Sequence, residues 1–165
     1  MAKRERARLR RTLQDQISAA AYHEAGHAMM CHLMHLRIKS ISIGADELYG
    51  GETTHENPFH AKNRTRGDTI RARAQVEKIV MLCLGGPLAQ EKYAPRNPSR
   101  DYGGKIDFDT ASTLAMQFFR SSKTAAAYIG FAREWVRQKL EEPRVWAAVE
   151  RLASVLLEQR RISGS

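Results

Sequence analysis

Apolar residues recur at the 3.6-residue period of a helix over most of the chain. The first such segment predicts a helix over about residues 5–36, and its polar part before Ile17 is either continuous with it or a separate helix. The later segments are amphipathic in the same way and predict helices over about residues 69–84, 88–93, 107–119, 128–140 and 145–164. Asp68 is expected to cap the first of these later helices.

Two short segments have the alternation of a strand. Residues 38–43 alternate apolar and polar side chains and end at a glycine, which predicts a strand. Residues 48–54 follow after a turn and are expected to pair with it. Residues 55–67 are polar, contain His55 and His60, and are expected to form a loop. The predicted fold is therefore α+β and predominantly α-helical, with a small two- or three-stranded sheet.

A glycine-rich and proline-containing segment interrupts the second long apolar pattern. Gly85-Gly86-Pro87 should kink or break the helix there, because a proline inside a helix costs about 3 kcal/mol or more. Residues 94–105 are rich in proline, glycine and polar groups and are expected to form a loop.

Length and charge divide the chain into two parts. The 165 residues fit a single domain over residues 17–165, preceded by a basic extension over residues 1–16. Residues 1–11 hold six Lys or Arg and one Glu, so they supply five of the nine net positive charges. Such an extension is either a solvated surface helix or, through residues 3–11, a site for nucleic acid, an anionic membrane surface or an acidic partner.

Cysteine use and hydropathy indicate a compartment. Cys31 and Cys83 both lie in apolar helical segments, so a disulfide is not expected and a reducing cytosol is the default. No apolar run reaches the roughly 18 residues of a membrane span, and no secretory signal is visible. The expectation is a cytoplasmic protein without a membrane-spanning segment.

The first predicted helix contains the pattern His-Glu-x-x-His. His23 and His27 lie four residues apart, so they share one helix face and can hold one metal ion. Glu24 is rotated by about 100° from His23, which places a carboxylate beside the ion, where it can take a proton from a zinc-activated water. The pattern predicts a zinc site with Glu24 as general base.

The two histidines leave the site incomplete. A catalytic zinc site uses three protein ligands and a water. The longer signature HExxHxxGxxH does not fit, because Met30 and Leu33 stand where it needs a glycine and a histidine, and His32 is rotated by about 140° from His27. The third ligand must come from elsewhere in the chain.

Several segments resemble the zinc-protease domain of the FtsH family, the membrane-anchored AAA+ proteases. The resemblance covers roughly residues 17–164. Its most specific block is the HEAGH sequence, and the matching segments are Tyr22–Ala28, the strand at 38–43, Gly50-Gly51, Leu84–Glu91, Gly104–Ser112 and Leu152–Gly164. The family's domain is a helical, zincin-like fold with a small sheet, which agrees with the pattern.

The resemblance implies the missing ligand. The family's third ligand matches Asp107, which a carboxylate's chemistry allows. Asp109 is a rival in the same turn and Asp101 a weaker one, whereas Glu91 matches a glutamate that is structural in the family.

The departures from the family pattern limit what the resemblance implies. The chain contains no G-x-x-x-x-G-K-[ST] loop, so no ATP binding is expected, and no membrane anchor is expected either. Pro87 and Gln90 replace the family's arginine and glutamate. The segment between Phe119 and Trp135 is shorter than in the family, so its ring assembly cannot be carried over, although a homo-oligomer remains possible.

The resulting hypothesis is an ATP-independent zinc metalloendopeptidase, FtsH-like, with zinc bound by His23, His27 and Asp107. Flexible or unfolded polypeptide is the expected substrate, since no motor is present to unfold folded proteins. It would add as a strand to the edge formed by residues 48–54, where the candidate substrate-binding residues are Gly50, Gly51, Glu52 and Thr53.

Two alternatives remain. The chain is either a zinc-containing regulatory module that binds nucleic acid or an acidic partner through residues 3–11, or a clipping regulator like the small HExxH proteases that cleave repressors. Glu24 favours an enzyme over the regulatory module, because a purely structural zinc needs no base. The YHEAGH context and the Asp107 segment resemble the FtsH family more than the repressor-cleaving proteases.

Overall fold

The computed structural model describes residues 2–44, 51–56, 70–95 and 104–164. Within these ranges the chain is mostly helical and forms one small antiparallel sheet, which confirms the predicted α+β, predominantly α-helical class. The elements in chain order are α1 (Ala2–Leu33), β1 (Ile38–Ile43), β2 (Gly51–His55), α2 (Ile70–Tyr93), α3 (Gly104–Phe119), α4 (Ser122–Glu141), α5 (Pro143–Gln159) and β3 (Arg161–Ser163).

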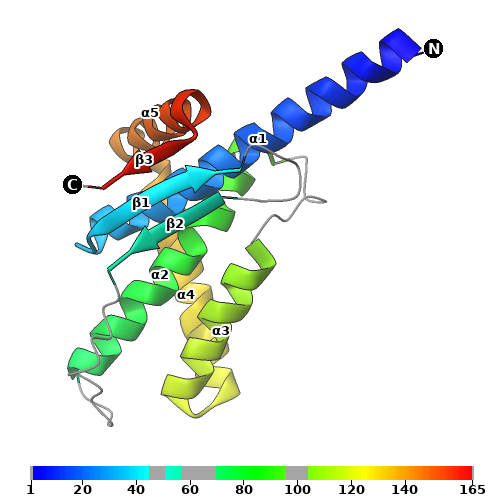
Figure 1. Ribbon diagram of the computed structural model, residues 1–165. Helices are drawn as coiled ribbons and strands as arrows, with labels where there is room; N and C mark the ends of the chain where they lie inside the picture. The colour runs from blue at the N-terminus through cyan, green and yellow to red at the C-terminus, as the bar shows by residue number, and fades with distance from the viewer. Residues whose placement is uncertain (1, 45–50, 57–69, 96–103, 165) are drawn as a thin grey trace.

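Helices α1 and α2 form the centre of the molecule. They pack along each other, with α3 and α4 against α2, and with α5 and the sheet against α1 (Figure 1). The N-terminal half of α1 extends beyond the other elements (Figure 1). Helix α1 is continuous from residue 2 to residue 33, so no separate helix precedes Ile17 and the expected boundary at residue 16 coincides with no break.

The sheet has the order β2-β1-β3, and both pairs are antiparallel. Strand β1 confirms the prediction for residues 38–43. Strand β2 runs from Gly51 to His55, and residues 48–50 of the predicted second strand lie outside the described ranges. His55, expected in a loop, is the last residue of β2.

The predicted last helix is too long. Helix α5 ends at Gln159 rather than near Gly164. Arg160 has a left-handed φ of 63° and donates its backbone N–H to the Leu156 carbonyl, which ends the helix and turns the chain. The following residues form β3, whose Ile162 pairs with Ile41 of β1. The sheet is therefore three-stranded because the chain's last residues return to β1.

Of the predicted kink or break in α2, the break is wrong. The helix runs without interruption from Ile70 to Tyr93 with Pro87 inside it. Pro87 lacks the N–H that a helix interior uses. Buried residues on both sides of Pro87, Leu84 and Leu88, hold the segment against its neighbours. Tertiary packing therefore overrides the local preference. The expected cap Asp68 lies outside the described residues.

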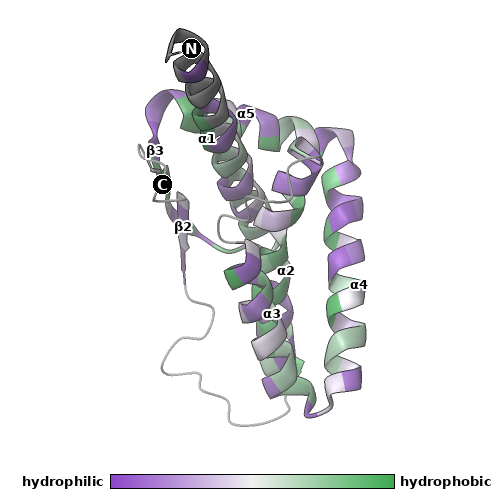
Figure 2. Cartoon of the chain, turned by 90° about the vertical axis from the view of Figure 1, so that its right-hand side faces the viewer, coloured by the Kyte–Doolittle hydropathy of each residue, from purple (hydrophilic) through white to green (hydrophobic). Residues whose placement is uncertain are grey.

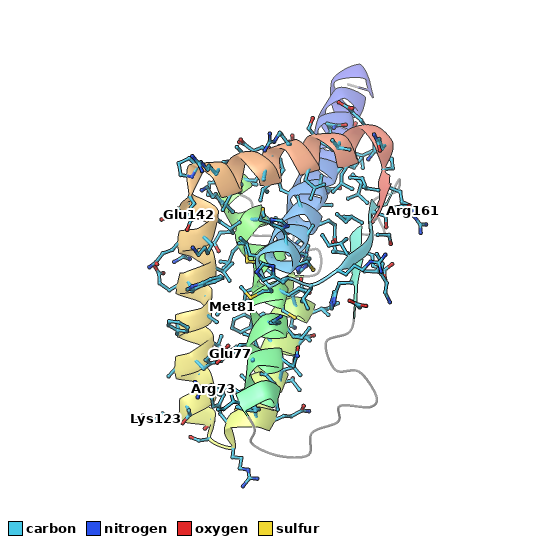
Figure 3. The ribbon with its side chains drawn as sticks, turned by 90° about the vertical axis from the view of Figure 1, so that its left-hand side faces the viewer. Arg73, Glu77, Met81, Lys123, Glu142 and Arg161 are labelled. Carbon is cyan, nitrogen blue, oxygen red and sulfur yellow. The ribbon has the colours of Figure 1, made fainter. Side chains whose placement is uncertain are left out.

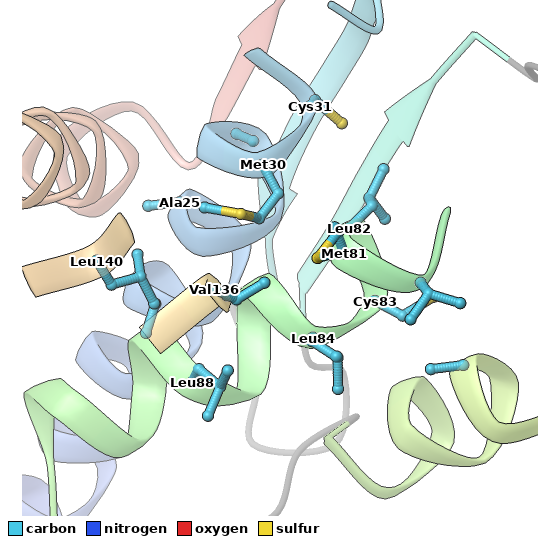
Figure 4. Packing of buried hydrophobic residues seen from close by; sticks show 14 of the residues in the cluster. Ala25, Met30, Cys31, Met81, Leu82, Cys83, Leu84, Leu88, Val136 and Leu140 are labelled. Carbon is cyan, nitrogen blue, oxygen red and sulfur yellow. The ribbon is translucent and has the colours of Figure 1, made fainter. Parts of the chain in front are cut away.

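Small residues bring α1 and α2 close together. Gly26 of α1 lies against the Gly85 carbonyl and Ala89 of α2, and a Cβ atom at position 26 would overlap both. Figure 4 shows buried side chains of the core cluster from three helices, with Ala25 and Met30 on α1, Leu84 and Leu88 on α2, and Val136 and Leu140 on α4. Close approach at the glycines brings the metal-binding face of α1 onto α2.

The exposed and buried parts of α2 are ordered along the helix. Near its start, Arg73 and Glu77 form an ion pair at 3.0 Å, with side chains 59% and 40% exposed. One turn further Met81 is buried (Figure 3). Ile70, one of the apolar positions of the predicted helix, is 90% exposed at its first residue. The polar end of α2 therefore leads into the buried half that contacts α1.

Helices α3 to α5 confirm most of the amphipathic pattern. Helix α4 alternates polar and apolar residues around its axis (Figure 2), and its N-cap Ser121 accepts a hydrogen bond from the Thr124 backbone. Phe108, expected on the buried stripe of α3, is 42% exposed. Asp107 is turned toward the protein, so Phe108, one residue later and about 100° around the helix, faces outward.

Cys31 and Cys83 are buried and unbridged, and burial raises the pKa of both thiols to about 12. Within the described ranges, none of the helices has the length and apolar character needed to cross a membrane.

Candidate metal centre

Three side chains from two distant helices converge at one point. The Nε2 atoms of His23 and His27 on α1 lie 3.0 Å apart, and the Asp107 Oδ2 atom of α3 lies 2.9 Å and 3.1 Å from them. Asp107 is 80 residues beyond His27 in the sequence. Within the described part of the chain, this is the group of His, Cys, Asp and Glu side chains that could hold a metal ion.

The second nitrogen of each histidine is already bonded to α2. His27 Nδ1–H donates to the Leu82 carbonyl at 2.8 Å, and His23 Nδ1–H donates to Gln90 Oε1 at 2.9 Å. A carbonyl oxygen only accepts, so the proton of each neutral imidazole is on Nδ1 and Nε2 carries a lone pair. Such outer hydrogen bonds fix the tautomer and orientation of metal-binding histidines.

The convergence of three acceptor atoms favours a cation among them. Two imidazole lone pairs and a carboxylate oxygen within 3.1 Å repel one another unless a proton or a metal ion lies among them. Ligand atoms about 2.0–2.2 Å from one zinc ion lie roughly 3 Å apart, so the triangle has the size of a metal-ligand set. The residues present therefore fit a divalent ion.

The pKa values of His27 and Asp107 also indicate that the site favours a positive charge. Burial lowers the pKa of His27, but the hydrogen bond and charge of Asp107, together with the charge of Glu24, raise it by more, so the net shift is upward. Burial raises the pKa of Asp107, yet the hydrogen bonds and charges of both histidines bring it down to about 2. A carboxylate that stays ionised beside two imidazoles favours a bound cation.

Gly86 of α2 leaves room for the His27 ring. A Cβ atom at Gly86 would overlap the His27 imidazole. Both histidines are buried, His23 to 3% exposure and His27 to 7%, within the turn that packs on α2. The rings are therefore held by packing as well as by their hydrogen bonds.

Glu24 is buried beside the cluster and held by β2. The Thr53 hydroxyl donates to Glu24 Oε2 at 2.6 Å, and Gly51 lies so close to the same side chain that a Cβ atom there would overlap it. Burial raises the pKa of Glu24, and the charges of both histidines and the Thr53 hydrogen bond oppose that shift. The carboxylate does not belong to the ligand triangle, which leaves it available for proton transfer.

The donor set is typical of hydrolytic metal sites. Two histidines and one carboxylate with an open position occur in catalytic zinc sites and also in sites for ferrous iron. A buried glutamate next to the ligands can accept and return a proton. The arrangement suits metal-assisted hydrolysis, and nothing in the ligand atoms themselves identifies the metal.

The other candidate residues lie elsewhere. Asp109 is exposed and outside the cluster, in agreement with the preference for Asp107. Glu91 is exposed and forms ion pairs with Arg133 at 3.4 Å and Arg137 at 3.7 Å. His55 donates from Nδ1 to the Glu56 carbonyl. Gly50, His60 and Asp101 lie outside the described residues.

Sequence reasoning missed three contributors to the site. The Leu82 carbonyl, Gln90 and Gly86 all lie on α2 and contact the histidine rings. In the family pattern Gln90 only replaces a glutamate, but a polar side chain inside a buried helical segment is a signal that could indicate its role. Thr53 and Gly51, expected to bind substrate, contact Glu24, while Glu52 between them is exposed.

Comparison with known proteins adds no family to this picture. No family model matches the chain, and no curated protein matches it. The chemistry of the centre must therefore be inferred from its own residues, which are two buried histidines, a carboxylate from a second helix and a buried glutamate beside them.

Proposed function

We propose that this chain is an ATP-independent zinc metalloendopeptidase that hydrolyses peptide bonds in flexible or unfolded polypeptide. The observation that carries the proposal is the convergence of His23, His27 and Asp107 beside the buried carboxylate of Glu24. Structural zinc sites are closed by four protein ligands and need no base. Three ligands with a neighbouring base fit a hydrolytic centre better.

The chain's own residues would divide the work as follows. His23, His27 and Asp107 hold the ion, which when bound polarises the scissile carbonyl and lowers the pKa of water. Glu24 takes a proton from the attacking water and passes it to the leaving amine. Burial raises the pKa of Glu24 from its ordinary value, which brings the carboxylate closer to the range in which one group can both accept and return a proton near neutral pH.

Strand β2 is the proposed place for the substrate. It pairs with β1 on one side and is the outer strand in the order β2-β1-β3. An extended peptide that adds to such an edge is bound mainly through its backbone, so sequence matters little and flexibility matters much. The same strand contacts Glu24 through Gly51 and Thr53, which places the edge beside the base.

The resemblance to the FtsH family supports the proposal without carrying it. The resemblance selected Asp107 rather than Asp109, and Asp107 is the carboxylate that meets the histidines. ATP independence is proposed because the sequence contains no phosphate-binding loop.

The test combines metal analysis with peptide hydrolysis. Zinc content is measured first, together with iron, because the same ligand set suits ferrous iron. Wild-type protein and Glu24→Gln are then incubated with casein and with a peptide library. Glu24→Gln should retain the metal and fold while hydrolysis falls by about 10²–10⁴-fold. Glu150→Gln, at an exposed position of α5, is the matched control and should hydrolyse normally.

Two results would contradict the proposal. One is Glu24→Gln activity within a few-fold of wild type, which would remove Glu24 as the base. The other is a chain that binds zinc but cleaves neither substrate, which would favour a non-hydrolytic role.

A regulatory binding module is the second candidate. The observation in its favour is that α1 continues as one helix from the basic residues 2–11 to His23, so a partner bound there would be directly connected to the metal centre. If nucleic acid binds, its affinity should fall steeply with salt and be lost when residues 2–11 are removed. Peptide cleavage should survive the same truncation.

A further inference from the structure

Thr53 has a side-chain contact that its expected role does not explain. As part of the substrate edge it needed only its backbone. Its hydroxyl instead lies 2.6 Å from Glu24 Oε2 and 3.2 Å from the Glu24 carbonyl. A hydroxyl has one proton, and the shorter distance assigns it to the carboxylate oxygen.

The geometry of β2 directs this contact. Thr53 pairs with Ile41, and Gly51 pairs with Ile43, both buried residues of β1. Alternate residues of a strand face the same side, so Thr53 and Gly51 both face α1. Thr54 faces the other side, where its hydroxyl meets Ser40 at 2.6 Å. The strand therefore presents one hydroxyl and one bare backbone position to Glu24.

Together these two residues hold the carboxylate in one orientation. The Thr53 hydrogen bond occupies Oε2, while Gly51 lies against Cγ, Cδ and Oε1. A bond donated to Oε2 engages one lone pair of that oxygen, whereas both lone pairs of Oε1 stay free of the Thr53 hydroxyl and can accept a proton. Without it, a buried carboxylate on two rotatable bonds could turn either oxygen toward the cluster.

We propose that Thr53 is a positioning residue for the catalytic base, and that strand β2 thus orients Glu24 as well as offering an edge to the substrate. This inference rests on the proposed function. Thr53 acts through Glu24 and does not itself exchange a proton with substrate. Misplacement of a reacting group by about 1 Å can cost about 10²-fold in rate, so a lost hydrogen bond at this point affects turnover.

The experiment compares Thr53→Val, Thr53→Ser and Thr110→Val in the full-length, zinc-loaded chain. Valine matches threonine in shape and removes the donor, whereas serine keeps it. Thr110 is the control, because its hydroxyl bonds the Ile106 carbonyl at 2.8 Å on the exposed side of α3. The readouts are zinc content, kcat and KM for an unstructured fluorogenic peptide, and Tm.

Thr53→Val should lower kcat by about tenfold to a hundredfold, with KM and zinc content within about twofold of wild type. Thr53→Ser should restore kcat to within about threefold, and Thr110→Val should leave kcat unchanged. A loss in Thr53→Ser as large as in Thr53→Val, or a change confined to KM, would overturn the inference, since either would indicate a role in packing or in substrate binding.

A second measurement tests the contact without any activity. The Tm shift caused by Thr53→Val should largely disappear when Glu24 is replaced by alanine, because the hydroxyl then has no carboxylate to bond. Equal shifts in both backgrounds would show that Thr53 does not act through Glu24. If wild-type protein hydrolyses nothing, the proposed function fails while this measurement still decides the contact. If it hydrolyses peptide and Thr53→Val is normal, only the positioning role fails.

Discussion

The two halves of the metal centre differ in how they are held. His23 and His27 are 3% and 7% exposed on α1, and both donate Nδ1–H to groups on α2. The Asp107 side chain is 23% exposed in the first turn of α3, between the exposed residues Ile106 and Phe108. Packing and hydrogen bonds to α2 position the imidazoles, whereas the Asp107 Oδ2 atom lies against the two Nε2 atoms of the imidazoles themselves.

This difference predicts a division of labour. The histidine half is positioned by the fold, and the aspartate half depends on the cation that joins it to the histidines. A bound ion would then link α1 to α3 and contribute to stability as well as to catalysis, because binding to the folded state alone stabilises it.

The largest expected effect comes from removing the aspartate. Asp107→Ala should lower metal affinity by orders of magnitude and bring Tm close to that of wild-type protein in chelator, because the ion then has two protein ligands from one helix. Asp109→Ala is the matched control and should change neither quantity. Zinc content and melts with and without chelator measure both. Metal loss in Asp109→Ala alone would mean that the ligand register is wrong by two residues.

One methyl group added beside His27 should destabilise the histidine half of the metal centre. Gly86→Ala places a Cβ atom on the buried His27 ring and should cost about 1–3 kcal/mol of unfolding free energy even without metal, as overpacking does. Gly130→Ala is the control, because nothing lies within 4 Å of a Cβ atom there and an exposed helical glycine gains up to about 1 kcal/mol from alanine. Denaturant unfolding in chelator compares the two; equal effects would show that the ring is not tightly packed.

Loss of the hydrogen bond that His23 donates should have the next largest effect. Gln90→Met keeps most of the side-chain volume and removes the acceptor of Nδ1–H, so metal affinity should fall by about 10–100-fold, the usual cost of losing such an outer partner. Gln138→Met on α4, where Gln138 bonds the exposed Glu134, is the control. Competition with a chromogenic chelator measures the affinities. Unchanged binding in Gln90→Met would leave packing as the sole support of His23.

Metal affinity should depend on pH. The pKa of His27 is raised, because Asp107 outweighs the effect of burial, so a proton competes with a metal ion for His27 up to a higher pH than at an ordinary histidine. Affinity should fall by about tenfold per unit as pH decreases below that pKa. The folding stability of metal-free protein should change with pH in the opposite direction. The stabilisation by protonated His27 is fully present below about pH 6.5, the ordinary pKa of histidine, and is lost as pH rises through the raised pKa. Chelator titrations and melts across pH 5–9 test both signs.

The smallest effect should come from the exposed neighbour of Asp107. Phe108→Ser removes a 42%-exposed ring and should change stability by no more than about 0.5 kcal/mol, with metal affinity unchanged. A large loss of metal affinity would show that the aspartate half is held by apolar packing after all, and would remove the contrast between the two halves. Thermal melts and chelator competition on the same samples are sufficient.

Local rules in the sequence are enough to predict several features. The helical period identified the His-Glu-x-x-His turn and the buried stripes of α4 and α5, and strict alternation identified β1. These features depend on residues a few positions apart, so each can be derived from one segment. The choice between Asp107 and Asp109 cannot be made that way, since it depends on the family resemblance and on the position of α3 in the structure.

Only tertiary structure decided the rest. Helix α2 continues through Pro87 because the residues around it are buried against α1 and α4, and β3 forms because α5 returns the chain to β1. Gln90 contacts His23 from 67 residues away in the sequence, and the Leu82 carbonyl contacts His27 from 55 residues away. Thr53 contacts Glu24 from 29 residues away. Local pattern determines which residues can share a helix face, whereas contacts between distant segments depend on how closely whole elements pack, here on the glycines between α1 and α2.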